Sequence, residues 1–238
     1  MRDSVVAPFA APTLSAEHYQ GVFGALHTSI DLAIADFSRR LTSQVRLPPA
    51  SSLIEILRAF KEAIPNESYA RIQRAHLPGR YEVPGHIKYL DAPGFLISKF
   101  NVVRMLELLD DRKRSILDLG SGPAHVLYLA RALGHGVLAT DLTWPPSSMD
   151  GKSHLFDDLR AILGIPFAVL DVKKKEPIRF EGRFDLITAL DIGYGAGWSA
   201  DDWDWHIEDL LNNVLLPSGI LCLQPLASRT DPEAWSHI

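Results

Sequence analysis

The segment SILDLGSGPAH, residues 115–125, constrains the fold more than any other part of the chain. Its apolar run Ile116–Leu119 includes Asp118 and predicts a short buried strand. Gly120 and Gly122 predict a sharp turn directly after it, because glycine lacks a Cβ and lets the backbone approach a ligand closely. A helix is expected next, with its amide-rich N-terminus facing whatever lies over the turn.

Short apolar strands alternate with helical patterns from Ser115 onward. Such an alternation is typical of a parallel sheet with right-handed crossovers. We therefore predict an α/β fold, a Rossmann-like, mostly parallel sheet with helices on both faces. The expected strands are Ile116–Leu119, Val137–Leu142, Phe167–Val172, Phe184–Leu190 and Gly219–Gln224, and helices are expected over Ala124–Leu133, Ser153–Gly164 and Trp203–Leu216.

The first hundred residues have helical periodicity. One apolar face begins near Ser15, and Ser52 and Glu55 form a capping-box pattern at the start of a second helix. A longer helix with Phe100 and Val103 on its buried side precedes the first strand. We expect residues 1–100 to form a helical accessory segment or lid, and residues 101–238 to form the ligand-binding domain.

Composition excludes several classes of function. The formal net charge of −5 argues against a nucleic-acid surface, since domains that bind nucleic acid are usually basic. The single cysteine, Cys222, excludes an internal disulfide and a cysteine-based zinc cluster, and we expect no metal site. No apolar stretch approaches the roughly 18 residues that span a bilayer, and the N-terminus lacks the pattern of a signal peptide. The expectation is a cytoplasmic protein without a membrane or nucleic-acid partner.

Four acidic residues lie near the ends of four of the expected strands: Asp118, Asp141, Asp171 and Asp191. In open α/β sheets ligands bind outside the carboxyl ends of the strands, so these acids are expected at one edge. A carboxylate after the second strand is placed to accept hydrogen bonds from both hydroxyls of a ribose. The pattern predicts a ligand that contains adenosine.

Two interpretations of the glycine turn remain open. A dinucleotide-binding turn has the pattern G-x-G-x-x-G, and here His125 occupies the third glycine position. A nicotinamide-dependent oxidoreductase is therefore an alternative. S-adenosylmethionine has no phosphate and carries a cationic amino group and a sulfonium, which suits an acidic sheet edge better than a pyrophosphate does.

The chain resembles the class I S-adenosylmethionine-dependent methyltransferases over about residues 115–225. The resemblance rests on four motifs in the expected order: ILDLGSGPA, VLATDL, RFDLITALDIGYG and LLPSGILCLQP. The preceding stretch KYLDAPGFLISKFNVVRMLELLDDRKRS also resembles the helical lead-in of a bacterial branch of these enzymes.

The resemblance implies a role for each matching position. Asp118 would lie near the amino group of the cofactor's methionine, and Asp141 would bind the ribose. Asp191 would face the methionine end or the substrate. The cofactor-binding set implied is Asp118, Gly120, Ser121, Gly122, Asp141, Leu142, Asp171, Val172 and Asp191.

The chain departs from the family's pattern at two places. Ala124 replaces the third glycine of the common G-x-G-x-G form, a replacement that we expect to be tolerated because the residue would be helical. About a dozen residues follow the fifth expected strand, where the family usually adds a helix and a final strand pair. We therefore expect that the sheet is shortened, that the terminal strands come from elsewhere, or that the sequence is a fragment.

Methyl transfer from this cofactor is an in-line displacement, in which the protein mainly orients the reactants and excludes water. A general base is needed only for a protonated nucleophile, and Asp191 and His206 are the candidates. Tyr194, Trp198, Trp205 and His86 are candidate residues of a substrate pocket, while Trp203 shares a helical face with apolar residues and is expected in the core.

The function predicted is methyl transfer to a small-molecule acceptor by an enzyme that could form a homodimer. The alternative from another class is a non-catalytic S-adenosylmethionine-binding or scaffold protein with the same fold.

Overall fold

A computed structural model describes residues 55, 89, 92–142 and 152–226 of the chain. The helices expected before residue 92 lie outside these residues, as does His86. The described strands are β1 (Ser115–Leu119), β2 (Gly136–Asp141), β3 (Phe167–Val169), β4 (Phe184–Ile192) and β5 (Leu215–Pro225). The described helices are α5 (Ala92–Met105), α6 (His125–Ala132), α7 (Lys152–Leu163) and α8 (Ala200–Asp209), the last followed by a π-helical turn (Leu210–Val214). None of the helices in this part of the chain has the length and apolar character needed to cross a membrane.

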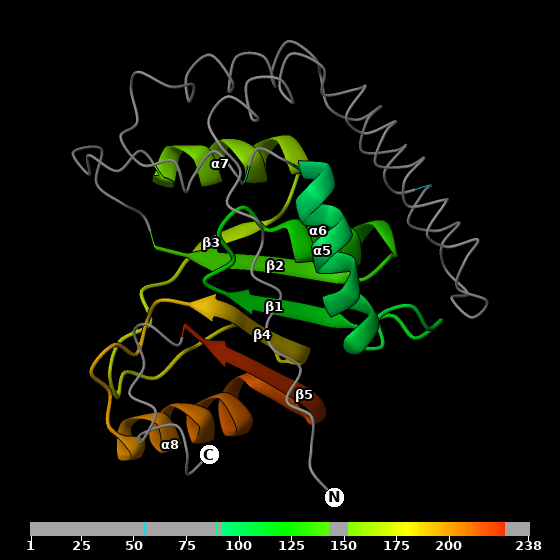
Figure 1. The fold of residues 1–238 in the computed structure, drawn as a ribbon. Helices are drawn as coiled ribbons and strands as arrows, with labels where there is room; N and C mark the ends of the chain where they lie inside the picture. Colours follow the sequence, from blue (N-terminus) through cyan, green and yellow to red (C-terminus); the bar gives the residue numbers. More distant parts are fainter. Residues whose placement is uncertain (1–54, 56–88, 90–91, 143–151, 227–238) are drawn as a thin grey trace, which may run out of the picture.

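The five strands form one sheet in the order β3-β2-β1-β4-β5, and every neighbouring pair is parallel. All five arrows in Figure 1 accordingly point the same way, so the carboxyl ends of the strands share one edge. β1 is central and pairs with β2 over its whole length and with β4 over residues 116–118. The predicted α/β, Rossmann-like parallel sheet is confirmed.

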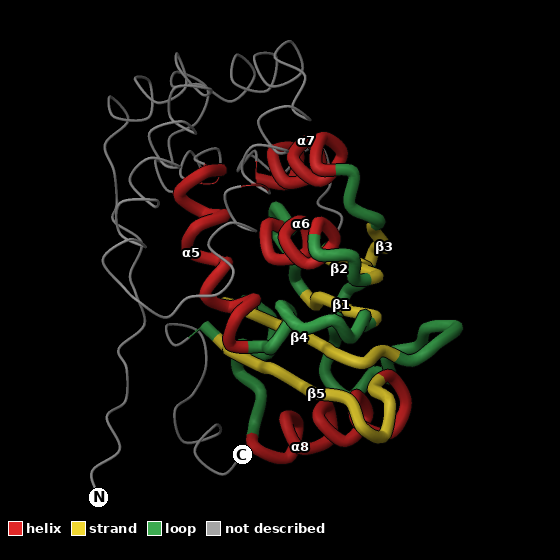
Figure 2. Tube along the Cα trace, turned by 90° about the vertical axis from the view of Figure 1, so that its right-hand side faces the viewer, coloured by secondary structure: helices red, strands yellow, loops and turns green. Residues whose placement is uncertain are grey.

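Each face of the sheet is covered by its own hydrophobic cluster, because successive residues of a strand point to opposite faces. Ile116 packs in the cluster formed with α5, α6 and α7, whereas Leu117 and Leu119 pack in the cluster formed with α8. Figure 2 shows α8 on the opposite side of the sheet from α5 and α6. By this alternation, Asp118 belongs to the face that α5 and α6 cover.

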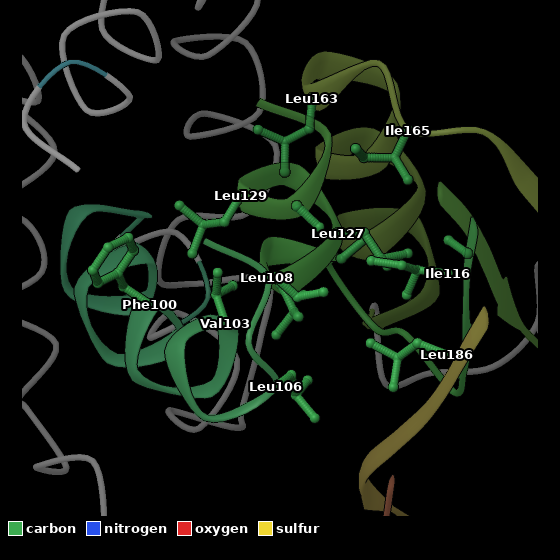
Figure 3. Packing of buried hydrophobic residues seen from close by; sticks show 14 of the residues in the cluster. Phe100, Val103, Leu106, Leu108, Ile116, Leu127, Leu129, Leu163, Ile165 and Leu186 are labelled. Carbon is green, nitrogen blue, oxygen red and sulfur yellow. The ribbon is translucent and has the colours of Figure 1, made fainter. Parts of the chain in front are cut away.

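Helix α5 is tied to this domain by its apolar side. Phe100 and Val103 are buried there, and Figure 3 shows them pointing from α5 toward Leu129 of α6. The helix spans residue 100, the expected boundary between the two parts of the chain. The packing brings Lys99 of the same helix to within 3.6 Å of Asp191 on β4.

Two element boundaries differ from the prediction. The third strand was expected to reach Val172 but ends at Val169, because its partner β2 ends at Asp141, which pairs with Val169. The helix expected over 203–216 ends at Asp209, and the chain passes through the π-helical turn into β5 at Leu215. Leu215 is buried and pairs with Phe184 of β4, so the end of the expected helix is part of strand β5 instead.

Candidate functional site

In the glycine turn after β1, every second residue from Gly120 to Ala124 has a left-handed backbone conformation. Gly120, Gly122 and Ala124 have φ values of 72°, 53° and 59°. The expectation that Ala124 is helical was wrong: it is the N-cap of α6 and adopts the left-handed conformation that a glycine would take at lower cost. Ser121 fixes the turn to β2, because its amide donates to the Thr140 carbonyl at 2.9 Å.

Asp118 is a buried carboxyl beneath this turn, with 5% of its surface exposed. The Thr188 hydroxyl on β4 donates to its Oδ1 at 2.7 Å. Burial raises the pKa of Asp118 from 3.8 to about 7, while the Thr188 hydrogen bond and the nearby Lys99 charge oppose this rise. The carboxyl therefore exchanges its proton near neutral pH, and a cation bound beside it would favour the ionised form.

Asp141, at the end of β2, accepts two backbone hydrogen bonds. The Gly122 amide donates to its Oδ2 at 3.0 Å and the Leu142 amide to its Oδ1 at 2.8 Å. Arg160 of α7 lies 3.5 Å from the same Oδ2 and donates to the Gly122 carbonyl at 2.7 Å. The network joins the turn, β2 and α7 around one carboxylate.

Arg160 itself is enclosed, with 4% of its side chain exposed. Its guanidinium also pairs with Asp157 and lies over the Phe167 ring, 4.0 Å from the centroid. An arginine that is buried and engaged on several sides fixes its partners rather than sampling solvent.

The carboxyl end of β4 is more open. Asp191 has φ 55° and 56% of its side chain is exposed. Lys99 of α5 places its Nζ 3.6 Å from Asp191 Oδ2, and its positive charge also lowers the pKa of Asp118 and His125. Tyr89 is close as well, since its pKa is raised by burial and by the Asp191 charge. Lys99 therefore carries its charge close to Asp191 of β4 and near Asp118 of β1.

Asp171 and Val172 follow the shortened β3. The Leu170 amide donates to the Asp141 carbonyl at 3.0 Å, which keeps this segment beside the end of β2. Asp171 is 57% exposed and lies 3.8 Å from Lys173 Nζ, while Val172 packs against the cluster under α8.

Tyr194 and Trp198 in the loop after β4 form a cluster of rings with Trp203 and His206 of α8. The Trp198 and Trp203 centroids are 5.0 Å apart, and His206 Nε2 lies 3.4 Å from the Tyr194 hydroxyl. Trp203 is buried as predicted, and Trp198 is buried beside it with 8% exposed. Trp205 is half-buried on the same helix.

His206 has no exposed surface, and burial lowers its pKa to about 4. The histidine is therefore neutral at physiological pH. Burial, with the nearby Asp118 charge, raises the pKa of Tyr194, so its hydroxyl stays protonated.

Three residues that are important to this arrangement were not identified from the sequence. Lys99 and Arg160 each occupy a position on the apolar side of a helix, in register with Val103 and Leu163, and a charged residue there is the signal that could have found them. Gly195 is the third, since a Cβ at this position would lie 2.2 Å from the Trp203 ring.

Comparison with known proteins finds no matching family model and no matching curated protein. Solved structures do resemble the chain. The DesVI protein of Streptomyces venezuelae is 12% identical with a TM-score of 0.41, and the match covers 55% of this chain and 50% of that one.

Two further similar structures are of methyltransferases. A TehB-like SAM-dependent methyltransferase from Corynebacterium glutamicum is 20% identical, with a TM-score of 0.39 and coverage of 56% and 71% of the two chains. An S-adenosylmethionine-dependent methyltransferase from Clostridium acetobutylicum is 16% identical, with a TM-score of 0.38 and coverage of 54% and 49%. The match spans little more than half the length of the first structures found.

The order of the parallel strands, with the glycine turn after β1 and acids at the ends of β2 and β4, agrees with the motif order found in the sequence. The described domain has a Rossmann-like α/β fold. This fold places Asp118, Asp141 and Asp191 near the carboxyl ends of neighbouring strands. The ring cluster that contains His206 lies on the face of the sheet that α8 covers.

Proposed function

We propose that the protein binds S-adenosylmethionine at the carboxyl ends of β1, β2 and β4 and transfers its methyl group to a small molecule. The observation that carries the proposal is a set of three carboxylates: Asp118 precedes the glycine turn, Asp141 accepts a hydrogen bond from it, and Asp191 lies near the carboxyl end of the neighbouring strand β4. A pyrophosphate would bring its negative charges to these acids, whereas a sulfonium and an ammonium would be attracted to them. The donor set therefore fits S-adenosylmethionine.

The residues of the site suggest how the cofactor would be held. Asp141 is proposed to accept hydrogen bonds from the ribose, with the backbone of Gly120–Gly122 beneath the cofactor and Leu142, Asp171 and Val172 toward the adenine. Asp118 is proposed to face the ammonium of the methionine group. When bound, the cofactor supplies a methyl group already activated by its sulfonium, so the chain's work is to orient the reactants and exclude water.

A proton on the acceptor would need a base, and Asp191 is the candidate with an exposed carboxylate. His206 is less suited to that role because it is fully buried and its pKa is about 4. We propose that it acts by holding Tyr194. Its burial is also the observation that favours the second candidate function, a binding protein without chemistry.

Calorimetry with S-adenosylhomocysteine tests the cofactor. The parent protein should bind it, and Asp141→Ala should weaken binding by roughly tenfold or more, because a charged hydrogen-bond partner is lost. Glu181→Ala, a change at an exposed loop residue, is the matched control and should bind like the parent. Failure of the parent to bind, or tighter binding of NAD, would overturn the proposal. Transfer of labelled methyl to a panel of small molecules would then exclude the non-catalytic alternative.

A further inference from the structure

Lys99 is a cation beside the acids near the carboxyl ends of β1 and β4. Its Nζ lies 3.6 Å from Asp191. Its positive charge also acts to lower the pKa of Asp118, the buried carboxyl under the glycine turn. Among the described residues, Lys99 is the one cation paired with Asp191, and none forms an ion pair with Asp118. The other cation nearby, Arg160, is occupied by Asp141, Asp157 and the Gly122 carbonyl.

The Lys99–Asp191 pair is weak and can exchange partners at little cost. At 3.6 Å it is longer than a charged hydrogen bond, and Asp191 is 56% exposed. Exposed pairs of this kind contribute little to stability because solvent screens them. The Lys99 side chain is 25% exposed, so its ammonium is partly accessible to a ligand.

The combination of one ammonium and two carboxylates matches the charges of an α-amino acid group. Such a group carries an ammonium, which Asp118 and Asp191 can bind, and a carboxylate, which neither of them can. A carboxylate placed beside two acids needs a cation within a few ångströms, since like charges repel. Lys99 is the described residue that supplies it.

We propose that Lys99 binds the carboxylate of the cofactor's methionine group and exchanges Asp191 for it when the cofactor binds. The inference rests on the proposed function and names the contact that would distinguish the whole cofactor from a bare nucleoside. The match between Lys99 and the ligand is one of charge, so arginine at this position should serve and an uncharged side chain should not.

The test compares Lys99→Met, Lys99→Arg and the parent by calorimetry with two ligands. One is S-adenosylhomocysteine, and the other is its decarboxylated analogue, which keeps the ammonium and the thioether. Lys99→Met should weaken binding of S-adenosylhomocysteine by roughly ten- to a hundredfold and leave binding of the analogue within about twofold of the parent. Lys99→Arg should retain most of the affinity. Lys113→Met, at the opposite edge of the sheet, is the control and should change neither affinity.

Any other outcome contradicts either the role of Lys99 or the proposed cofactor. Equal weakening of both ligands by Lys99→Met would show that Lys99 acts through Asp191 or the fold, and unchanged or tighter binding of S-adenosylhomocysteine would show that no such contact exists. Both results overturn the role of Lys99 and leave the proposed cofactor in place. If the parent binds neither ligand, the proposed function fails and the inference fails with it. A thermal melt of each variant identifies any loss of folding.

Discussion

The two ends of the candidate site differ in how far the folded chain already holds them. At the end of β2, Asp141 accepts hydrogen bonds from two backbone amides and forms an ion pair with the buried Arg160. At the end of β4, Asp191 is more than half exposed and has one long ion pair with Lys99. The first, which we call the closed end, is built by the fold itself, so a ligand would meet groups that are already oriented. At the second, the open end, the arrangement of the side chains depends on what binds there.

The largest difference between the ends should appear in stability. Arg160→Met removes a buried guanidinium from Asp141, Asp157 and the Gly122 carbonyl, so it should lower the free energy of unfolding by about 3 kcal/mol. Lys99→Met, the equivalent change at the open end, should lower it by less than about 1 kcal/mol. Urea denaturation measures both. Equal losses would show that the two ends are held alike.

Asp118 lies between the two ends, and its burial predicts a dependence of stability on pH. Its pKa in the folded protein is about 7, above its ordinary value of 3.8, so the folded state binds a proton that the unfolded state has lost. The stabilisation from this carboxyl is present below pH 4 and disappears as the pH rises through 7. Asp118→Asn does not titrate, and its stability relative to the parent should rise by about 4 kcal/mol between pH 4 and pH 8.

Denaturation curves of the parent and of Asp118→Asn across that pH range make the comparison. The buried His125 and His206, whose pKa values lie well below 6.5, destabilise both proteins at acidic pH and cancel in the difference. Parallel pH profiles for the two proteins would contradict the raised pKa of Asp118.

At the open end, a change of charge should alter binding much more than stability. Asp191→Asn removes the ion pair with Lys99, and asparagine tolerates the left-handed backbone at φ 55°. The free energy of unfolding should change by less than about 0.5 kcal/mol, because the pair is exposed. Affinity for S-adenosylhomocysteine should fall roughly fivefold, since an acid facing its ammonium is lost. A large loss of stability would show that this end is also built by the fold.

The sequence predicted the closed end well because its chemistry follows from the backbone. A strand, a glycine turn and an acid after the next strand must meet at one edge when the strands are parallel, so Asp118, Gly122 and Asp141 could be placed together without knowing any side-chain contact. The burial of Trp203 followed in the same way from helical periodicity.

The open end was harder to predict because it depends on how helices lie against the sheet. Lys99 reaches Asp191 only through the angle at which α5 packs on α6, and no spacing in the sequence encodes that angle. His206 was a candidate base because the sequence places it near the end of β4, yet tight packing with Tyr194 and Trp198 buries it completely. The length of β3 was overestimated for a related reason, since it depends on where its partner strand ends.

The smallest expected effect concerns Ala124, at the closed end. Its left-handed backbone costs about 1–2 kcal/mol, which Ala124→Gly would recover. The same change loses a buried methyl group, worth about 0.8 kcal/mol, and gives the unfolded chain more freedom, worth about 0.4–1 kcal/mol. These contributions nearly cancel, so the free energy of unfolding should change by less than about 0.5 kcal/mol. Ala124→Val, whose branched side chain resists this backbone, should cost about 1–3 kcal/mol in the same urea titration. If valine were tolerated as well as glycine, the turn would not depend on the left-handed conformation at this position, and the closed end would be less rigidly built than its hydrogen bonds indicate.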